Sequence, residues 1–223
     1  DPDILAANSG QNSQFRATLD RPLTLYGVAS PTGAVLPVLA SYENDQLHPF
    51  NARDEMLDQV TNLRKKFANY VDYSKATITD MFTVEELSDT KKRDAKELRT
   101  VLFRNDQTTG SPGRFVVQLL PAEAQFSPAF ALATVDVNAD GLLDLVIGGN
   151  RQHNRVRIGK SDANRGQLFL NRGRGQFVYV PMFESGLLWN GDVSDLAMLR
   201  TGGKAALLVG VKGQLVQTFT LVN

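Results

Sequence analysis

Short runs of apolar or alternating residues, separated by turn residues, recur through most of the chain. Such runs are typical of β-strands, and clusters of Gly, Asn, Asp and Pro mark the turns between them. A parallel sheet would need a crossover helix between most strands, and the connections after residue 100 leave no room for one. The pattern therefore predicts a mainly β chain, with strands at residues 23–28, 35–42, 114–120, 129–135, 142–147, 167–170, 176–180, 205–211 and 215–221.

One segment, residues 51–99, has a helical pattern instead. Asn51 is a suitable N-cap for a first helix, and Thr83 with Glu86 forms the capping-box pattern of a second. Residues 91–93 are expected on a solvent-facing helix of balanced charge. We therefore expect a helical insertion over 51–99. Its amphipathic face is marked by apolar residues at three- and four-residue spacing, which are Met56, Leu57, Val60, Leu63, Phe67 and Tyr70.

An internal repeat suggests how the strands are organised. An apolar strand that ends in glycine occurs at 145–148 and again at 207–210, and a Gly-Gln-Leu sequence follows each copy. Residues 25–42 and 102–115 resemble other parts of the same unit. Repeated four-stranded units are typical of β-propellers, because each sheet buries its faces against its neighbours. The fold we expect is mainly β, a partial β-propeller of about three blades with an α-helical insertion.

The repeat also predicts the domain layout. Residues 1–50 would hold blade segments, residues 51–99 the helical insertion, and residues 100–223 the remaining blades. Residues 3–8 match the second strand of a unit at 144–148. We therefore expect a truncated first blade in a chain that is part of a longer protein, whose other parts supply the missing blades.

The composition excludes several kinds of chemistry. The 24 basic and 24 acidic residues cancel, which argues against nucleic acid as a partner of the whole surface. The absence of cysteine excludes disulfides, thiolate catalysis and cysteine-bound zinc. Two histidines, His48 and His153, are too few for a three-histidine metal site. No run reaches the ~18 consecutive apolar residues that a membrane-spanning helix needs, so no membrane span is expected.

Residues 136–144, with the sequence DVNADGLLD, point to a specific ligand. Oxygen-bearing side chains stand at positions 1, 3, 5 and 9 of this loop, and glycine stands at position 6. Calcium takes about six to eight oxygen ligands, and alternate residues of a tight loop can all point inward. We therefore predict a Ca²⁺ site formed by the side chains of Asp136, Asn138, Asp140 and Asp144 and by the carbonyl oxygen of Leu142.

Three other interpretations of the 136–144 loop compete with this one. An EF-hand needs a bidentate Glu at position 12, where this chain has Ile147, and helical flanks where it has strand-like ones. A solvated turn without an ion stays open as an alternative. So does a pair of catalytic carboxylates, although such a pair needs contrasting environments to separate its pKa values, and one short polar loop offers none.

The 136–144 loop, the apolar strand after it and the sequence LFLNRGRGQF at 168–177 together resemble the FG-GAP/VCBS repeat. Residues 49–82 are similar to a segment that interrupts the propeller in large envelope proteins of the Bacteroidetes. The resemblance implies a propeller with a calcium ion in each blade. It also implies an exported protein, at the cell surface or outer membrane of a Gram-negative bacterium, that serves adhesion by binding a glycan or protein ligand.

Two further loops depart from the repeat pattern. In the first repeat, the loop at 29–37 has lost every expected carboxylate. In the last repeat, Arg200 and Ala206 stand at positions 1 and 9. We therefore expect one complete calcium site in this chain, and we expect the other two loops to close without metal.

Residues 151–174 carry a local excess of positive charge. Arginine forms paired hydrogen bonds with carboxylates and phosphates, so this stretch is a candidate surface for an acidic polysaccharide or another anionic partner. A solvated loop whose charge is balanced elsewhere is the alternative, and nucleic acid is a poor candidate because the stretch lacks interleaved aromatic residues. The candidate ligand-binding residues are Arg151, Arg155, Arg157 and Lys160.

These features together predict a non-enzymatic, calcium-stabilised module that binds a glycan or a protein. Ca²⁺ is its predicted cofactor, and no catalytic residues are assigned. The alternative is part of a propeller-based hydrolase or lyase that acts on polysaccharides. Paired carboxylates in a central funnel would favour the enzyme, and the sequence shows no evident pair.

Overall fold

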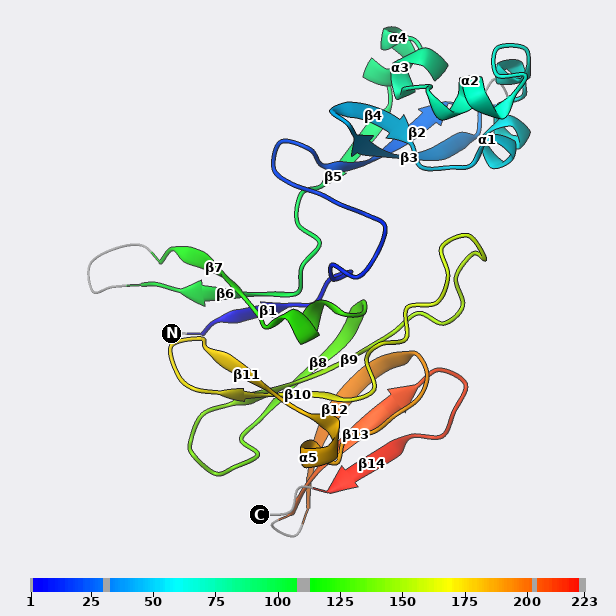
Figure 1. Cartoon of the computed structure of the whole chain (residues 1–223). Coiled ribbons are helices and arrows are strands. Elements are labelled where there is room, and N and C mark those ends of the chain that lie inside the picture. The colour runs from blue at the N-terminus through cyan, green and yellow to red at the C-terminus, as the bar shows by residue number, and fades with distance from the viewer. Residues whose placement is uncertain (1, 30–32, 108–112, 202–203, 221–223) are drawn as a thin grey trace. The chain divides into compact units, whose positions relative to one another are not determined.

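The computed structural model describes residues 2–29, 33–107, 113–201 and 204–220, and it is mainly β, with 39% strand and 16% helix. Its strands form four antiparallel sheets, none of them closed. Contacts divide the chain into two units (Figure 1), a large unit of Asp1–Gln14 with Arg99–Asn223 and a small unit of Phe15–Leu98. No helix among the described residues is long and apolar enough to span a membrane. The prediction of a mainly β chain is confirmed.

Within its described residues, the large unit contains three antiparallel sheets and two short helical turns. One sheet, in the order β11-β10-β9-β8, consists of β8 (Ala129–Val135), β9 (Asp144–Gly149), β10 (Gln167–Asn171) and β11 (Phe177–Val180). A second, in the order β12-β13-β14, consists of β12 (Val193–Thr201), β13 (Lys204–Val211) and β14 (Gln217–Thr220). The third, in the order β1-β6-β7, consists of β1 (Ile4–Ala6), β6 (Val101–Asn105) and β7 (Phe115–Leu119). The turns are η2 (Ala122–Gln125) and α5 (Met182–Ser185).

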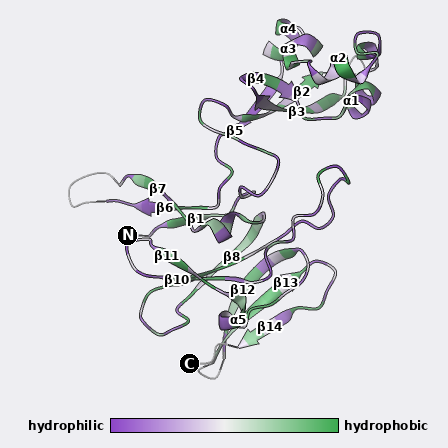
Figure 2. Cartoon of the chain, in the orientation of Figure 1, coloured by the Kyte–Doolittle hydropathy of each residue, from purple (hydrophilic) through white to green (hydrophobic). Residues whose placement is uncertain are grey.

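Strand β9, inside the sheet of β8 to β11, is buried on both faces. Successive residues of a strand point to opposite faces, and all six residues of β9 are buried. Val146 packs with Trp189 in the cluster shared with the β12-β13-β14 sheet. Leu145 and Ile147 belong to a second cluster, shared with the β1-β6-β7 sheet. Figure 2 shows hydrophobic residues concentrated on these strands and hydrophilic residues in most of the loops between them.

The small unit combines one sheet with short helices. The sheet, in the order β4-β3-β2-β5, consists of β2 (Leu23–Ala29), β3 (Val35–Glu43), β4 (Gln46–Pro49) and β5 (Lys91–Ala95). The helices are α1 (Arg53–Gln59), η1 (Thr61–Arg64), α2 (Tyr70–Ser74), α3 (Ile78–Met81) and α4 (Val84–Ser88). Sheet and helices share one core, which includes Val38, Met56 and Ile78.

The helical pattern predicted within residues 51–99 is present but broken into short pieces. Helix α1 ends at Gln59, and its N-cap is Ala52 rather than the predicted Asn51, whose carbonyl oxygen accepts a hydrogen bond from the Tyr73 hydroxyl at 2.7 Å. The predicted capping box is confirmed, since Thr83 N–H donates to Glu86 Oε2 at 2.8 Å and Glu86 N–H donates to Thr83 Oγ1 at 3.2 Å.

The end of the predicted insertion is a strand, which corrects the helix expected at residues 91–93. Strand β5 pairs with β2 along Lys91–Ala95, and the Thr24 hydroxyl donates a hydrogen bond to Asp94 Oδ1 at 2.7 Å. Pairing with the open edge of the sheet gives the backbone N–H and C=O groups of these residues hydrogen-bond partners. These bonds outweigh the local preference for a helix. Contacts group helices α1 to α4 with β2 to β5 in the small unit, Phe15–Leu98.

Candidate functional site

The predicted calcium loop connects β8 to β9 as a hairpin loop. Val135, the last residue of β8, lies opposite Asp144, the first residue of β9. The loop residues Ala139 and Gly141 have left-handed φ values of 57° and 84°, which turn the chain sharply between the strands. Strands flank the loop on both sides, as expected, so the EF-hand interpretation is excluded by the structure.

Asp136 opens the loop, and the backbone of the turn wraps around its carboxylate. Oδ1 accepts a hydrogen bond from the Asp140 N–H at 3.2 Å, and Oδ2 accepts one from the Gly141 N–H at 2.9 Å. A carboxylate oxygen has two lone pairs. Each oxygen of Asp136 therefore keeps one lone pair for a cation.

Asp140 is exposed and is favoured in its charged form. Its Oδ1 accepts a hydrogen bond from the Leu142 N–H at 2.8 Å, and its Oδ2 accepts one from Asn138 Nδ2 at 2.9 Å. These hydrogen bonds, together with the positive charge of Arg172, hold the pKa of the Asp140 carboxyl below its usual value. Asn138 Oδ1 accepts the Asp140 N–H at 3.2 Å. The side chains at positions 1, 3 and 5 thus share one hydrogen-bonded turn.

Asp144, at position 9, is fully buried. Its Oδ2 accepts the Val137 N–H at 2.9 Å, and its Oδ1 accepts the Asn171 N–H of β10 at 2.8 Å. No Lys, Arg or His in the described parts of the chain forms an ion pair with this carboxylate. A buried charge is costly unless it is hydrogen-bonded or binds a cation. Asp144 therefore connects the hairpin loop to β9 and β10, and within the described parts of the chain its hydrogen-bond donors are two neutral N–H groups.

The loop fits calcium by the chemistry of its donors. Three carboxylates, an amide oxygen and backbone carbonyls are the hard oxygen ligands that calcium prefers. Within the described residues, no group of three His, Cys, Asp or Glu side chains lies close enough to hold a metal ion. Asp136, Asp140 and Asp144 are therefore not gathered into one such group, and the other two predicted ligands are the Asn138 side chain and the Leu142 carbonyl. Calcium binding therefore stays a prediction that the donor set favours.

The two degenerate loops are also hairpin loops, which connect β2 to β3 and β12 to β13. In the small unit, Ala29 pairs with Val35 across the turn, and residues 30–32 lie outside the described residues. In the large unit, Leu199 pairs with Ala206, and residues 202–203 are likewise not described. Position 9 is Pro37 in the first of these loops and Ala206 in the second, and neither has a carboxylate to bridge its neighbours, so closure of these loops without metal remains the expectation.

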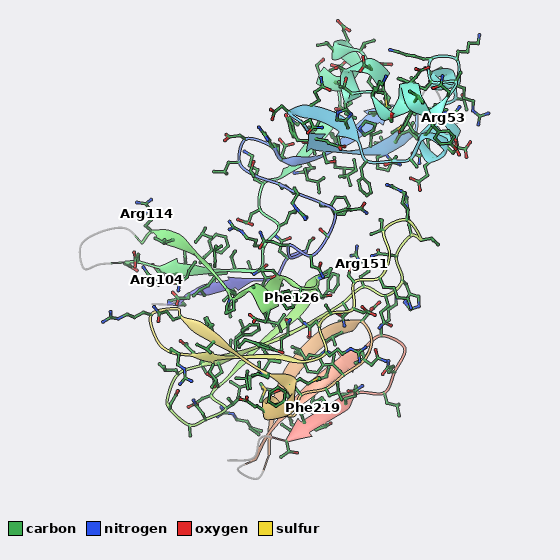
Figure 3. All side chains as sticks on the ribbon, in the orientation of Figure 1. Arg53, Arg104, Arg114, Phe126, Arg151 and Phe219 are labelled. Atoms are coloured by element: carbon green, nitrogen blue, oxygen red, sulfur yellow. The ribbon has the colours of Figure 1, made fainter. Side chains whose placement is uncertain are left out.

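The basic stretch forms a loop on a two-residue stem. Arg151 and Ser161 exchange backbone hydrogen bonds, in which the Arg151 N–H donates to the Ser161 carbonyl at 2.7 Å and the reverse bond measures 3.0 Å. Val156, within this loop, is 100% exposed. Arg151 lies at the base of the loop (Figure 3), and in sequence Arg155 and Arg157 fall within the loop while Lys160 directly precedes the stem residue Ser161.

A cleft of about 390 Å³ opens beside Arg151. Its described lining consists of Phe130, Asn150, Arg151, His153, Asp192, Val193, Ser194 and Lys212. The Arg151 guanidinium lies 5.3 Å from the centroid of the Phe130 ring. Asp192 Oδ1 accepts the Gln152 N–H at 2.7 Å, and its Oδ2 lies 3.7 Å from His153 Nδ1. Of the four predicted ligand-binding residues, only Arg151 lines this cleft.

Sequence reasoning missed the other walls of this cleft. Phe130 comes from β8, Asp192 precedes β12 and Lys212 follows β13, so the lining comes from distant parts of the chain. Asn150 links two of these parts, because its Nδ2 donates to the Gly191 carbonyl at 3.0 Å. Its left-handed φ of 90° and its burial are consistent with this structural role. No local sequence signal marks such a contact.

The chain was compared with known proteins at three levels. No protein-family model matches it, no curated protein matches it, and no solved structure matches it. The resemblance to FG-GAP/VCBS repeats therefore rests on the residues of the 136–144 loop and its flanking strands, and it stays a prediction.

Proposed function

We propose that this chain is a calcium-binding, non-enzymatic β-propeller module of the FG-GAP/VCBS type, belonging to an exported or surface protein that binds a glycan or a protein ligand. The observation that carries the proposal is the 136–144 loop, a β-hairpin loop with oxygen donors at positions 1, 3, 5 and 9. The packing of three antiparallel sheets through two apolar clusters supports the propeller architecture.

Calcium would stiffen the sheet of β8 to β11 at one end. Asp136, Asn138, Asp140, Asp144 and the Leu142 carbonyl would hold the ion, whose charge would offset the repulsion among three carboxylates. Asp144 also accepts the Asn171 N–H, so the constraint would extend from the hairpin to β10. Extracellular modules bind calcium at about 0.1–1 mM, which suits a site outside the cytosol.

Calcium binding is tested best at Asp140. The hydrogen bonds of its carboxylate to Asn138 and Leu142 stay within the loop and the side chain is exposed, so Asp140→Ala removes a ligand at little cost in stability. We expect isothermal titration calorimetry of the chelator-treated chain to show one site with a Kd of about 0.1–1 mM. A hundredfold excess over that Kd would stabilise the fold by about 2.7 kcal/mol. Asp140→Ala should weaken binding at least tenfold.

The control for this titration removes an acid elsewhere. Asp162→Ala deletes the single carboxylate of the basic stretch and should leave the calcium affinity unchanged. Equal calcium affinities in the Asp140→Ala and unmodified chains would show that the 136–144 loop is not the calcium site. If millimolar calcium leaves the melting temperature of the chain unchanged, the result would favour the solvated turn without an ion.

The cleft beside Arg151 is the proposed ligand surface. Arg151 and Lys212 bring two cationic groups to its lining, where His153 and Asp192 already face each other. An arginine fork binds a carboxylate through two parallel hydrogen bonds. The cleft therefore favours an anionic ligand, such as the carboxylate-bearing sugars of an acidic polysaccharide.

Affinity electrophoresis through alginate tests this surface. We expect the chain to be retarded by alginate and not by a neutral glucan, with a retardation that falls as salt rises. Arg151→Ala should weaken the apparent affinity about tenfold, a loss of roughly 1.4 kcal/mol. Lys160→Ala removes an equal charge from outside the cleft lining and should have a smaller effect.

Three outcomes would count against this assignment. Equal losses in the Arg151→Ala and Lys160→Ala variants would assign the binding to general charge rather than to the cleft. If alginate does not retard the chain, acidic polysaccharides are excluded as its class of ligand. Release of shortened alginate chains would favour the hydrolase or lyase alternative over a binding module.

A further inference from the structure

Two sheets of the large unit repeat the same strand pair. In the β1-β6 pair, Ile4 lies opposite Phe103. In the β9-β10 pair, Leu145 lies opposite Phe169. Both pairs are antiparallel, and each places an aliphatic residue, one position after an aspartate, opposite a phenylalanine. Strand β1 is therefore the structural counterpart of β9, and β6 is the counterpart of β10.

A side-chain hydrogen bond repeats at the same register position. The Asn105 N–H donates to Asp3 Oδ1 at 2.8 Å, just before β1 begins. The Asn171 N–H donates to Asp144 Oδ1 at 2.8 Å, where β9 begins. Asp3 thus corresponds to Asp144, the ninth residue of the 136–144 loop. A shared polar contact and a shared register together make the equivalence specific.

The two counterparts differ at their other edge. Strand β9 is covered there by β8, whereas β1 is the edge of its sheet in the described part of the chain. The difference is visible in side-chain exposure, because Ile4 is 52% exposed and its counterpart Leu145 is completely buried. The unpaired N–H and C=O groups of such an edge are a template for another strand.

We propose that the free edge of β1 accepts one further antiparallel strand with the residue pattern of β8, which enters through an aspartate-rich hairpin loop that ends at Asp3. The β8-β9 pair shows how that strand would lie. Thr134 lies opposite Leu145 and Val135 lies opposite Asp144. In the same register, the last residue of the added strand lies opposite Asp3 and the one before it lies opposite Ile4.

The residue pattern of β8 explains why this kind of strand fits. Along β8 the residues alternate between buried and more exposed positions, and Ala131, Ala133 and Val135 are buried. Small buried residues let a neighbouring sheet approach closely. The hairpin loop would also bring an N–H to Asp3 Oδ2, as Val137 does for Asp144. Main-chain hydrogen bonds supply the affinity in this mode of recognition, and alternate side chains supply the specificity.

A graft of the chain's own sequence tests the proposal. Residues 129–143 are placed directly before Asp3, so that a second copy of β8 and its loop leads into β1. Hydrogen exchange and thermal unfolding are measured in chelator, which makes the result independent of the calcium proposal. We expect amide exchange in β1 to slow at least tenfold and the melting temperature to rise by about 3 °C or more.

The control carries the same graft with Ala133→Pro and Thr134→Pro in the added copy. Successive residues of a strand point their N–H groups to opposite edges, so one of the two prolines removes a ladder donor whichever way the strand faces. This variant should exchange and melt like the ungrafted chain. Equal behaviour of the graft and its proline control would overturn the proposal. So would an ungrafted chain that sediments as a dimer with protected β1 amides, because a second copy would then occupy the edge.

Discussion

Asp144→Ala is expected to lower the free energy of unfolding of the large unit by about 2–5 kcal/mol, because it removes the acceptor of two N–H groups at a buried site. Each buried donor without a partner costs about 1–3 kcal/mol. The N–H of Val137 belongs to the hairpin loop and that of Asn171 to β10, so both would lose a partner at once. Urea unfolding is followed by fluorescence of Trp189, the single tryptophan, which is buried in the large unit.

Asp3→Ala is the matched control for this substitution. Asp3 makes the equivalent hydrogen bond to Asn105 but is exposed, so water can replace the lost acceptor. Its replacement should cost less than about 1 kcal/mol. Both variants are measured in chelator, which separates the structural role of Asp144 from any role in holding calcium. Equal losses from the two variants would show that burial of Asp144 is not what makes its hydrogen bonds important.

Local patterns allowed much of the fold to be predicted. Strand β8 occupies the predicted residues 129–135, because its alternation of buried and more exposed residues matches the pleat of a strand that packs on one face. The Thr83–Glu86 capping box is confirmed, since its geometry depends only on residues within one turn. The 136–144 loop was found for the same reason. Its residues are spaced along a short stretch of sequence, so a hairpin loop could be recognised without knowledge of distant contacts.

Features that depend on distant pairing were not predictable. Strand β5 carries mostly exposed charged residues, so it has no hydrophobic period, and only its pairing with β2 makes it a strand. The cleft beside Arg151 needs Asp192 and Lys212, whose sequence neighbours give no sign of that contact. The contact between Asp144 and Asn171 likewise joins separate strands. The sequence alone could therefore identify the candidate ligands of a cation, but not the second role of Asp144.

Gly149→Ala is expected to destabilise the large unit by about 3 kcal/mol or more. A Cβ at Gly149 would overlap the carbonyl oxygen of Pro128 and would lie 2.9 Å from its carbonyl carbon. These are backbone atoms, and the same oxygen accepts the Asn150 N–H at 3.0 Å, so relief of the overlap requires the start of β8 to move. At about 2–4 °C per kcal/mol for a chain of this size, the melting temperature should fall by roughly 6–12 °C.

Gly210→Ala separates steric overlap from the general effect of removing a strand glycine. Gly210 lies in β13, and an added Cβ would approach no closer than 3.6 Å, to the Asp195 carbonyl oxygen. Neither glycine has a left-handed φ, so alanine introduces no backbone strain at either position. Gly210→Ala should therefore change the stability by less than about 1 kcal/mol, in either direction. If the Gly149→Ala and Gly210→Ala variants have the same melting temperature, the close approach of β9 to Pro128 is not the reason for Gly149. The role of Gly149 would then lie in the flexibility of the end of β9, before the basic stretch.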